Sequence, residues 1–160
     1  MDAWLEGGLI GVIATIVMDL WALVVKHVLH LPATNWALVG RWFGHMPAGK
    51  FVHRPIGTTA SVRGELALGW AAHYAIGIAY GVAYVLAAGW FSTGFPPLVD
   101  ALLISLALLV FPWLVMQPAL GAGWFANRTP RPAVARLVSI SMHTAFGIGI
   151  YVGVRALAPM

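Results

Sequence analysis

Four long apolar runs constrain the fold of this chain more than any other feature. They cover residues 7–25, 66–88, 101–125 and 137–154. Each run is long enough to cross a hydrocarbon core of about 30 Å as a helix, because a helix rises about 1.5 Å per residue. Lipid offers the backbone no hydrogen-bond partner, so runs of this length are expected to be helices. A transmembrane barrel would instead show alternating stretches of about 10 residues. The runs predict an all-α integral membrane protein, a four-transmembrane-helix bundle.

The composition agrees with this prediction. Hydrophobic residues make up 61% of the 160 residues and charged residues 9%, whereas an average soluble domain has about 25% charged residues. A soluble protein of this size has too much surface per unit volume to cover with so few charges. We therefore expect a single membrane domain, 1–160, with spans at about 7–29, 65–88, 99–122 and 135–157.

The basic residues predict the orientation, because cytoplasmic loops collect positive charge. The loop at 89–98 between the second and third spans has no Lys or Arg. Both termini are therefore expected outside. This topology accounts for the basic pI of about 10.0 without a nucleic-acid partner. The expected partners are membrane lipid and either a second copy or another membrane protein. Eight of the nine basic residues lie in the connections after the first and third spans: Lys26, Arg41, Lys50, Arg54, Arg63, Arg128, Arg131 and Arg136.

The cytoplasmic loop at 31–64 is long enough to contain structure of its own. Thr34 or Asn35 could cap a short helix at about 35–44, where large apolar residues recur at helical spacing. We expect this helix to lie along the inner membrane interface with its apolar face toward lipid. The predicted interfacial residues, including one from the second inner loop, are Trp36, Arg41, Trp42 and Trp124.

A short motif, His-x-x-x-Gly-Ile, occurs in the second span at His73 and again in the fourth span at His143. This repetition predicts two similar helical hairpins related by an axis along the membrane normal. Residues four apart share a helix face, so each His lies on a stripe of small residues that permits close helix contact. The predicted helix-packing residues are Gly11, Gly69, Gly77, Gly81 and Gly147.

The ionisable residues within the spans define a candidate site. At about 1.5 Å per residue, His73, His143 and Asp19 all lie roughly 10 Å inside the basic boundary of the membrane. An ionisable residue is costly to bury in lipid and is a functional-site candidate, although a neutral His can also simply hydrogen-bond across helices. We expect these three residues to converge, with Gln117 as a further member and Glu65 at the inner mouth of the site.

Three functions are compatible with this pattern. The favoured one is a site for binding or transporting a proton, a metal ion or a small solute, since His changes charge between pH 5 and 8. The second is ligation of haem b by the two His residues, which lie beside Gly on separate helices. The third is a non-catalytic structural or partner subunit whose Trp-rich basic loop docks a protein or anionic lipid. The sequence contains no motif of a hydrolase, metalloenzyme or nucleotide-binding enzyme, so an enzyme is the least supported class.

Several stretches resemble a known family. They are MDLW at 18–21, NWALVGRWFGH at 35–45, GELALGWAAH at 64–73, FPWLVMQPALG at 111–121 and RTP at 128–130. They are similar to a bacterial family of small inner-membrane proteins catalogued only as a domain of unknown function. The resemblance covers nearly the full length and implies a bacterial four-helix protein of the inner membrane. It implies no activity, substrate or site residue.

Overall fold

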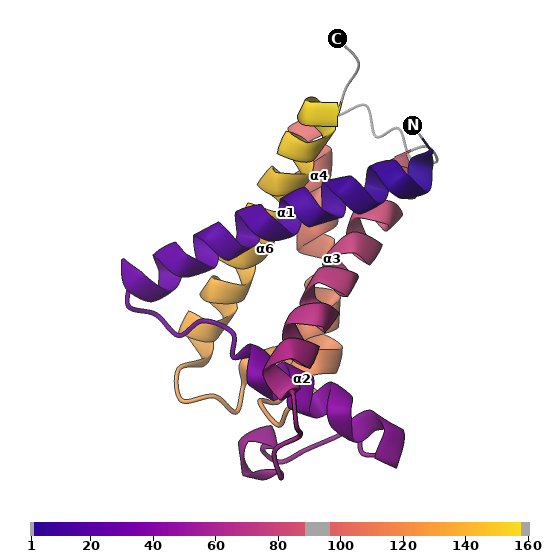
Figure 1. Ribbon diagram of the computed structural model, residues 1–160. Helices are drawn as coiled ribbons and strands as arrows, with labels where there is room; N and C mark the ends of the chain where they lie inside the picture. Colours follow the sequence, from indigo (N-terminus) through magenta and orange to yellow (C-terminus); the bar gives the residue numbers. More distant parts are fainter. Residues whose placement is uncertain (1, 89–96, 158–160) are drawn as a thin grey trace.

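The structure is a computed structural model that describes residues 2–88 and 97–157 (Figure 1). Within these ranges it is helical and contains no strand. Four segments are long and apolar enough to cross a membrane. The predicted four-helix membrane bundle is confirmed, and the chain is a multi-pass membrane protein. Residues 89–96 of the predicted outer loop lie outside the described residues. The principal helices of the four segments are α1 (Ala3–His27), α3 (Glu65–Ala88), α4 (Pro97–Ala107) and α6 (Pro132–Leu157).

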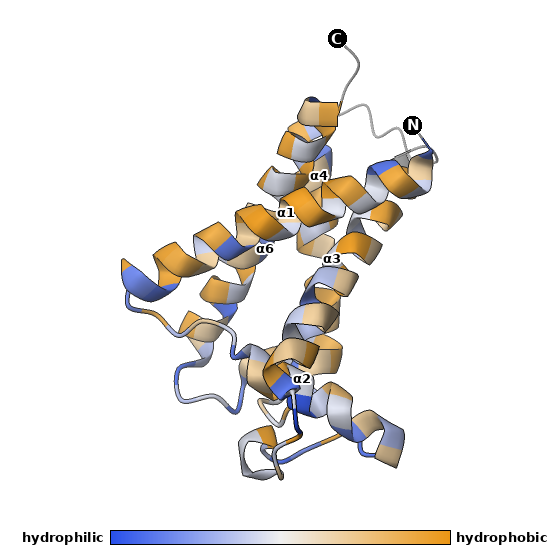
Figure 2. Ribbon diagram, in the orientation of Figure 1, coloured by the Kyte–Doolittle hydropathy of each residue, from blue (hydrophilic) through white to orange (hydrophobic). Residues whose placement is uncertain are grey.

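Hydrophilic residues gather in the connections at one end of the bundle, whereas the spans are mostly hydrophobic (Figure 2). We call this end the basic end. α1 finishes there, α3 and α6 begin there, and all eight basic residues of the first and third connections belong to it. Lys26 and His27 in the last turn of α1 complement the negative end of the helix dipole. Beyond α1, His30 adopts a left-handed φ of 52° and the chain turns toward the next helix.

Glycine contacts bring α1 and α3 unusually close together. A Cβ atom at Gly11 would lie 2.4 Å from the carbonyl oxygen of Gly77, and one at Gly81 would lie 2.3 Å from that of Gly7. Both distances are far below van der Waals contact, so only glycine fits. Small residues serve membrane helices in this way because close backbone approach increases dispersion contact. α1 consequently lies obliquely across α3, with α6 packed on it as well (Figure 1).

The two His-x-x-x-Gly motifs occupy equivalent places in two helix pairs, α1 with α3 and α4 with α6. In each pair, the residue that faces the Gly comes four positions before the residue that hydrogen-bonds the His, at its side chain in His73 and at its backbone carbonyl in His143. The same antiparallel register is therefore used twice. The facing residues are Thr15 for Gly77, Asp19 for His73, Ala101 for Gly147 and Ser105 for His143.

The buried core of the bundle lies away from the basic end. Its residues come from the first half of α1, the second half of α3, α4 and the second half of α6. The helices are thus tightly packed at that end and diverge toward the basic end, where Figure 1 shows α1 and α3 farther apart. The fully or nearly buried members are Ile10, Ala14, Tyr84, Ala101, Phe146 and Ile150.

The third span is interrupted by proline. α4 ends at Ala107, and a π-helix, η3 (Pro112–Met116), and a short helix, α5 (Gln117–Ala119), follow. Pro112 and Pro118 have no N–H group to donate, so the regular ladder of hydrogen bonds cannot continue through them. The Gln117 N–H group bonds the carbonyl of Pro112, five residues back. A wide π turn therefore lies between the two prolines.

The first connection contains a helix, α2 (Trp36–His45), whose N-terminus is capped by Asn35. α2 crosses the start of α3 through two glycines. A Cβ atom at Gly69 would lie 1.8 Å from the Trp36 carbonyl oxygen, and one at Gly40 would lie 1.7 Å from that of Glu65. This contact leaves no room for any side chain, so glycine at both positions determines where α2 sits.

The apolar face of α2 was expected to contact lipid, and this expectation is wrong for Trp42. Its side chain is only 9% exposed and packs with Ile56 and Ala119. The reason is that residues 46–64 fold back over α2 and dock on the end of the third span. The His53 N–H donates to the Ala119 carbonyl and the Ile56 N–H to the Leu120 carbonyl. Short 3-10 turns at Met46–Ala48 (η1) and Ile56–Thr58 (η2) shape this fold-back.

Candidate intramembrane site

Asp19 of α1 receives two hydrogen bonds from consecutive residues of α3. Its Oδ1 atom lies 2.8 Å from Nε2 of His73, and its Oδ2 atom accepts a hydrogen bond of 3.0 Å from the hydroxyl of Tyr74. The contact between Thr15 and Gly77, one turn away, brings the two helices close enough for these bonds. The His73 side chain is 6% exposed, whereas that of Asp19 is 22% exposed. One face of the carboxylate therefore remains open.

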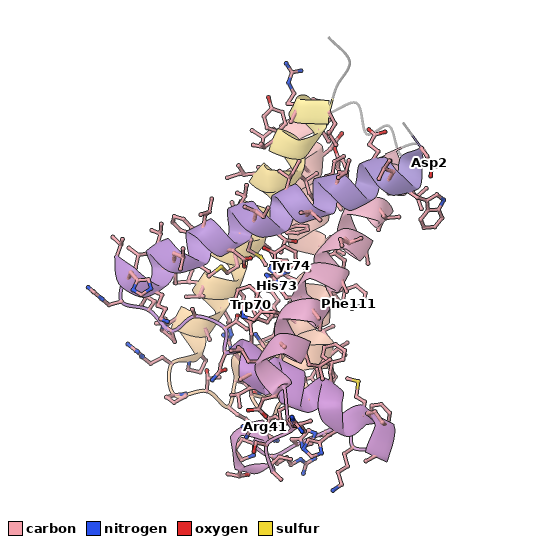
Figure 3. All side chains as sticks on the ribbon, in the orientation of Figure 1. Asp2, Arg41, Trp70, His73, Tyr74 and Phe111 are labelled. Carbon is pink, nitrogen blue, oxygen red and sulfur yellow. The ribbon has the colours of Figure 1, made fainter. Side chains whose placement is uncertain are left out.

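One face of the His73 ring stacks on the ring of Trp36, the first residue of α2. The two rings are stacked with centroids 3.9 Å apart and an interplanar angle of 26°. The Trp70 ring meets the edge of His73 at 5.6 Å, and Figure 3 shows Trp70, His73 and Tyr74 together on α3. Stacking of this kind fixes the plane of the imidazole, which keeps Nε2 directed at Asp19. Trp36, expected at the membrane interface, thus also covers the candidate site.

A cavity of about 1190 Å³ lies at the basic end of the bundle and reaches Asp19. Its walls come from α1, the linker to α2, the first residue of α2, α3, the π-helix and α6. Asp19, Tyr74, Gln117 and His143 all line it. We call it the basic-end cavity. His73 does not line the cavity but contacts Asp19, which does.

Gln117 and His143 present hydrogen-bonding groups to the basic-end cavity. The Gln117 Oε1 atom is buried and has no hydrogen-bond partner among the residues described. The His143 Nδ1 atom lies 3.1 Å from the carbonyl oxygen of Ser139, so it carries the proton in this bond and leaves Nε2 as an acceptor. Of the predicted site residues, Asp19 and His73 are in direct contact, and Gln117 and His143 share the cavity that Asp19 lines.

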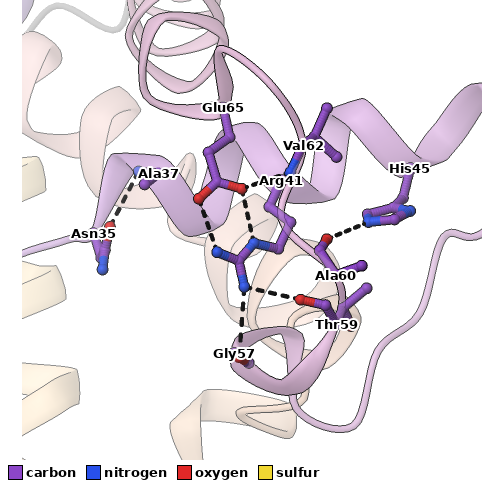
Figure 4. Close-up of polar contacts among 9 residues, drawn as sticks. All are labelled: Asn35, Ala37, Arg41, His45, Gly57, Thr59, Ala60, Val62 and Glu65. Atoms are coloured by element: carbon purple, nitrogen blue, oxygen red, sulfur yellow. Dashed lines mark hydrogen bonds and ion pairs between the residues drawn. The ribbon is translucent and has the colours of Figure 1, made fainter.

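Glu65 was expected at the inner mouth of this site, and the structure corrects that expectation. It does not line the cavity. Its carboxylate instead makes two parallel hydrogen bonds with Arg41 of α2, at 2.9 and 2.8 Å (Figure 4). The close approach of Gly40 to the Glu65 backbone places the next residue of α2, Arg41, opposite this carboxylate.

Arg41 is a structural anchor for the first connection. Besides Glu65, its guanidinium donates a hydrogen bond of 3.0 Å to the Thr59 carbonyl, and Glu65 also accepts from the Val62 amide (Figure 4). The hydrogen bond with Glu65 raises the pKa of Arg41 above its usual value, so this side chain stays charged. The pair joins α2, the fold-back segment and the start of α3, and both residues are half-buried.

Sequence reasoning missed two groups of residues at the site. Tyr74 and Trp70 were not selected, although residues four apart on a helix share a face and this pair flanks His73. Three residues lie at the cavity opening, and of these the Lys and the Arg served only to predict the topology. Their common location could not be read from the sequence because they come from three separate segments: Lys26, His30 and Arg131.

Metal and haem binding can be compared with this geometry. The described part of the chain contains no group of three or more His, Cys, Asp or Glu residues arranged to hold a metal ion. Haem ligation by His73 through Nε2 would require breaking its 2.8 Å contact with Asp19. The arrangement is instead that of a hydrogen-bonded carboxylate open to a cavity.

Fold and site together define a four-helix membrane protein with a polar cluster inside its spans. The chain belongs to the family described as protein of unknown function (DUF2938), which matches residues 9–157. This match includes every residue of the candidate site. Comparisons with curated proteins and with solved structures found no match.

Proposed function

We propose that this protein binds a small solute in the basic-end cavity and couples its binding or transport to a proton held at Asp19. One observation carries the proposal. A carboxylate within a membrane-spanning helix accepts hydrogen bonds from His73 and Tyr74 and keeps an open face toward a cavity. Ionisable groups are rare within membrane spans because a charge is costly there, and they commonly mark proton or solute pathways.

Protonation would change the hydrogen bonding of this cluster. The ionised Asp19 carboxylate only accepts, so it can satisfy both the imidazole N–H of His73 and the hydroxyl of Tyr74. A protonated carboxyl group becomes a donor at one oxygen and gives up one of these bonds. It can then donate to a solute or to water in the cavity. Occupancy of the cavity and protonation of Asp19 are therefore coupled.

The geometry supports the alternatives less well. Haem or metal ligation by His73 competes with its bond to Asp19. A docking role would draw on the Trp and basic residues of the first loop, and two of them, Trp42 and Arg41, are engaged within the protein. Proton-coupled binding uses both contacts in the ionised state and gives up only one of them on protonation.

We also propose the membrane setting of this activity. The distribution of Lys and Arg supports a bacterial inner-membrane location with the basic end in the cytoplasm and both termini outside. The basic-end cavity then opens to the cytoplasmic leaflet. Membrane lipid is the proposed partner, with a second copy or another membrane protein beside it, and no nucleic acid.

The decisive measurement is proton uptake by purified protein in liposomes. A potassium diffusion potential drives protons inward, and an enclosed pH-sensitive dye reports them. Asp19→Asn should lower the initial rate at least tenfold, because the amide cannot take up a proton. Glu6→Gln, which removes a carboxylate from the first turn of the same helix, should leave the rate unchanged.

A second readout tests proton binding without flux. Infrared difference spectra between acidic and neutral pH should contain a carbonyl band of a protonated carboxyl group that Asp19→Asn removes and Glu6→Gln retains. Wild-type flux together with an unchanged spectrum in Asp19→Asn would refute the proposal.

A further inference from the structure

The opening of the basic-end cavity is cationic. Lys26 at the end of α1 and Arg131 before α6 line it, and we call these two residues the cationic rim; His30 in the linker also lines the cavity. In the part of the chain that the structure describes, none of their side chains forms an ion pair. Among the described residues that line the cavity, Asp19 alone has a carboxylate, and it lies deeper. The rim therefore carries positive charge that no acidic residue of the cavity opening neutralises.

The cavity extends along α1 from the basic end into the membrane-spanning part of the helix. Asp19 precedes Lys26 by seven residues on α1, which is about 10 Å along a helix. Ile16, also in the lining, is a further three residues, or about 5 Å, deeper. Half of a hydrocarbon core of about 30 Å is about 15 Å. Along α1 the lining therefore extends about 15 Å, a length comparable to the thickness of one leaflet.

The walls between the rim and Asp19 are mostly apolar. They present flexible or aromatic side chains, among them Met18, Leu23, Trp70 and Met142. Methionine adapts to irregular apolar ligands because its side chain is unbranched. The unpartnered Oε1 atom of Gln117 requires a hydrogen-bond donor such as a hydroxyl group.

From this arrangement we infer that the ligand is an anionic amphiphile of the adjoining leaflet, with its anionic headgroup at the cationic rim and its apolar chain along the cavity walls. The inference rests on the proposed function and names the class of solute. A cavity of about 1190 Å³ exceeds the roughly 300–1,000 Å³ of ordinary small-molecule sites. It therefore suits a lipid-sized ligand better than an inorganic ion.

The test is lipid binding to the purified full-length protein, measured by native mass spectrometry in detergent. Phosphatidylglycerol, which carries a net negative charge and hydroxyl groups, is titrated against phosphatidylcholine with the same chains. The wild type should prefer phosphatidylglycerol. Lys26→Gln with Arg131→Gln should weaken phosphatidylglycerol binding about 30-fold, as expected for two basic contacts with an anionic lipid.

The matched control is Lys50→Gln with Arg128→Gln, which removes one Lys and one Arg from the same end of the bundle but outside the cavity lining. It should leave binding unchanged. A second variant keeps the charges: Ala22→Phe, in the cavity wall, should block the chain and weaken binding, whereas Ala83→Phe on the exposed face of α3 should not.

The outcomes separate this inference from the proposed function. Equal losses in the rim and control variants would overturn the inference, as would equal binding of the two lipids. Displacement of phosphatidylglycerol by inorganic phosphate at similar concentration would also overturn it, because a free anion would then be the ligand. In all three cases proton uptake that still depends on Asp19 would leave the proposed function standing. Loss of that dependence with lipid binding intact would instead remove the function and keep the lipid site.

Discussion

A single methyl group at Gly11 should separate α1 from α3. An alanine Cβ there would lie 2.4 Å from the Gly77 carbonyl oxygen and 2.7 Å from the Ile78 Cα atom. Both neighbours are backbone atoms, so no side-chain rotation can relieve the overlap. An ordinary contact needs about 3.4 Å, and the helices must therefore part by about 1 Å. The substitution Gly11→Ala tests whether glycine contact sets the geometry of the site.

The expected cost is about 1–3 kcal/mol in the free energy of unfolding, as for other insertions into a packed interface. Alanine also favours helix over glycine by up to about 1 kcal/mol, which hides part of this cost. Gly8→Ala supplies the correction. Its Cβ would meet only the Ile78 side chain, at 3.9 Å, so this variant should be neutral or stabilising. The difference between the two variants isolates the contact.

The same displacement should damage the candidate site. If the two helices move apart rigidly by about 1 Å, the 2.8 Å distance between Asp19 and His73 becomes about 3.8 Å, which is too long for a hydrogen bond. Stability is measured by SDS titration of the protein in mixed micelles, followed by tryptophan fluorescence, and function by proton uptake in liposomes. If Gly11→Ala matched Gly8→Ala in both measurements, the close contact deduced for α1 and α3 would be wrong.

Two further predictions concern other contacts. Arg41→Lys should loosen α2 and residues 46–64, because lysine cannot reproduce the two parallel bonds to Glu65. Limited proteolysis within residues 46–64 should be faster in this variant, and an unchanged cleavage rate would contradict the anchoring role. Ser105→Ala removes the hydroxyl that bonds the His143 carbonyl and should lower the free energy of unfolding by only about 0.6 kcal/mol, whereas a loss above about 2 kcal/mol in SDS titration would mean that more than this bond depends on Ser105.

Local sequence information selected several residues that the structure brings together. Spacing along single helices predicted that Asp19 and His73 lie at one depth, and the structure joins them by a hydrogen bond. The depths could be predicted because helical rise is uniform and the basic residues mark the ends of the spans. The same reasoning selected His143, and Gln117 was added as a polar residue of the third span; both line the cavity shared with Asp19.

Other features were beyond such reasoning because they depend on segments far apart in the chain. Glu65 was predicted at the inner mouth of the site, but α2 brings Arg41 against it. Trp42 looked like an interfacial residue, but the fold-back of residues 46–64 covers it. Trp36 contacts His73 only because glycines at the crossing of α2 and α3 allow the two helices to touch.

The sequence by itself determined that this protein spans a membrane four times and which residues are costly to leave there, because both follow from the transfer of single side chains and backbone groups into lipid. The tertiary structure decided which of those residues meet. Helix crossings set by glycine contacts close one end of the bundle and leave the basic end open. The cavity, its cationic rim and the carboxylate facing it exist only through that packing, since no single helix contains more than a part of them.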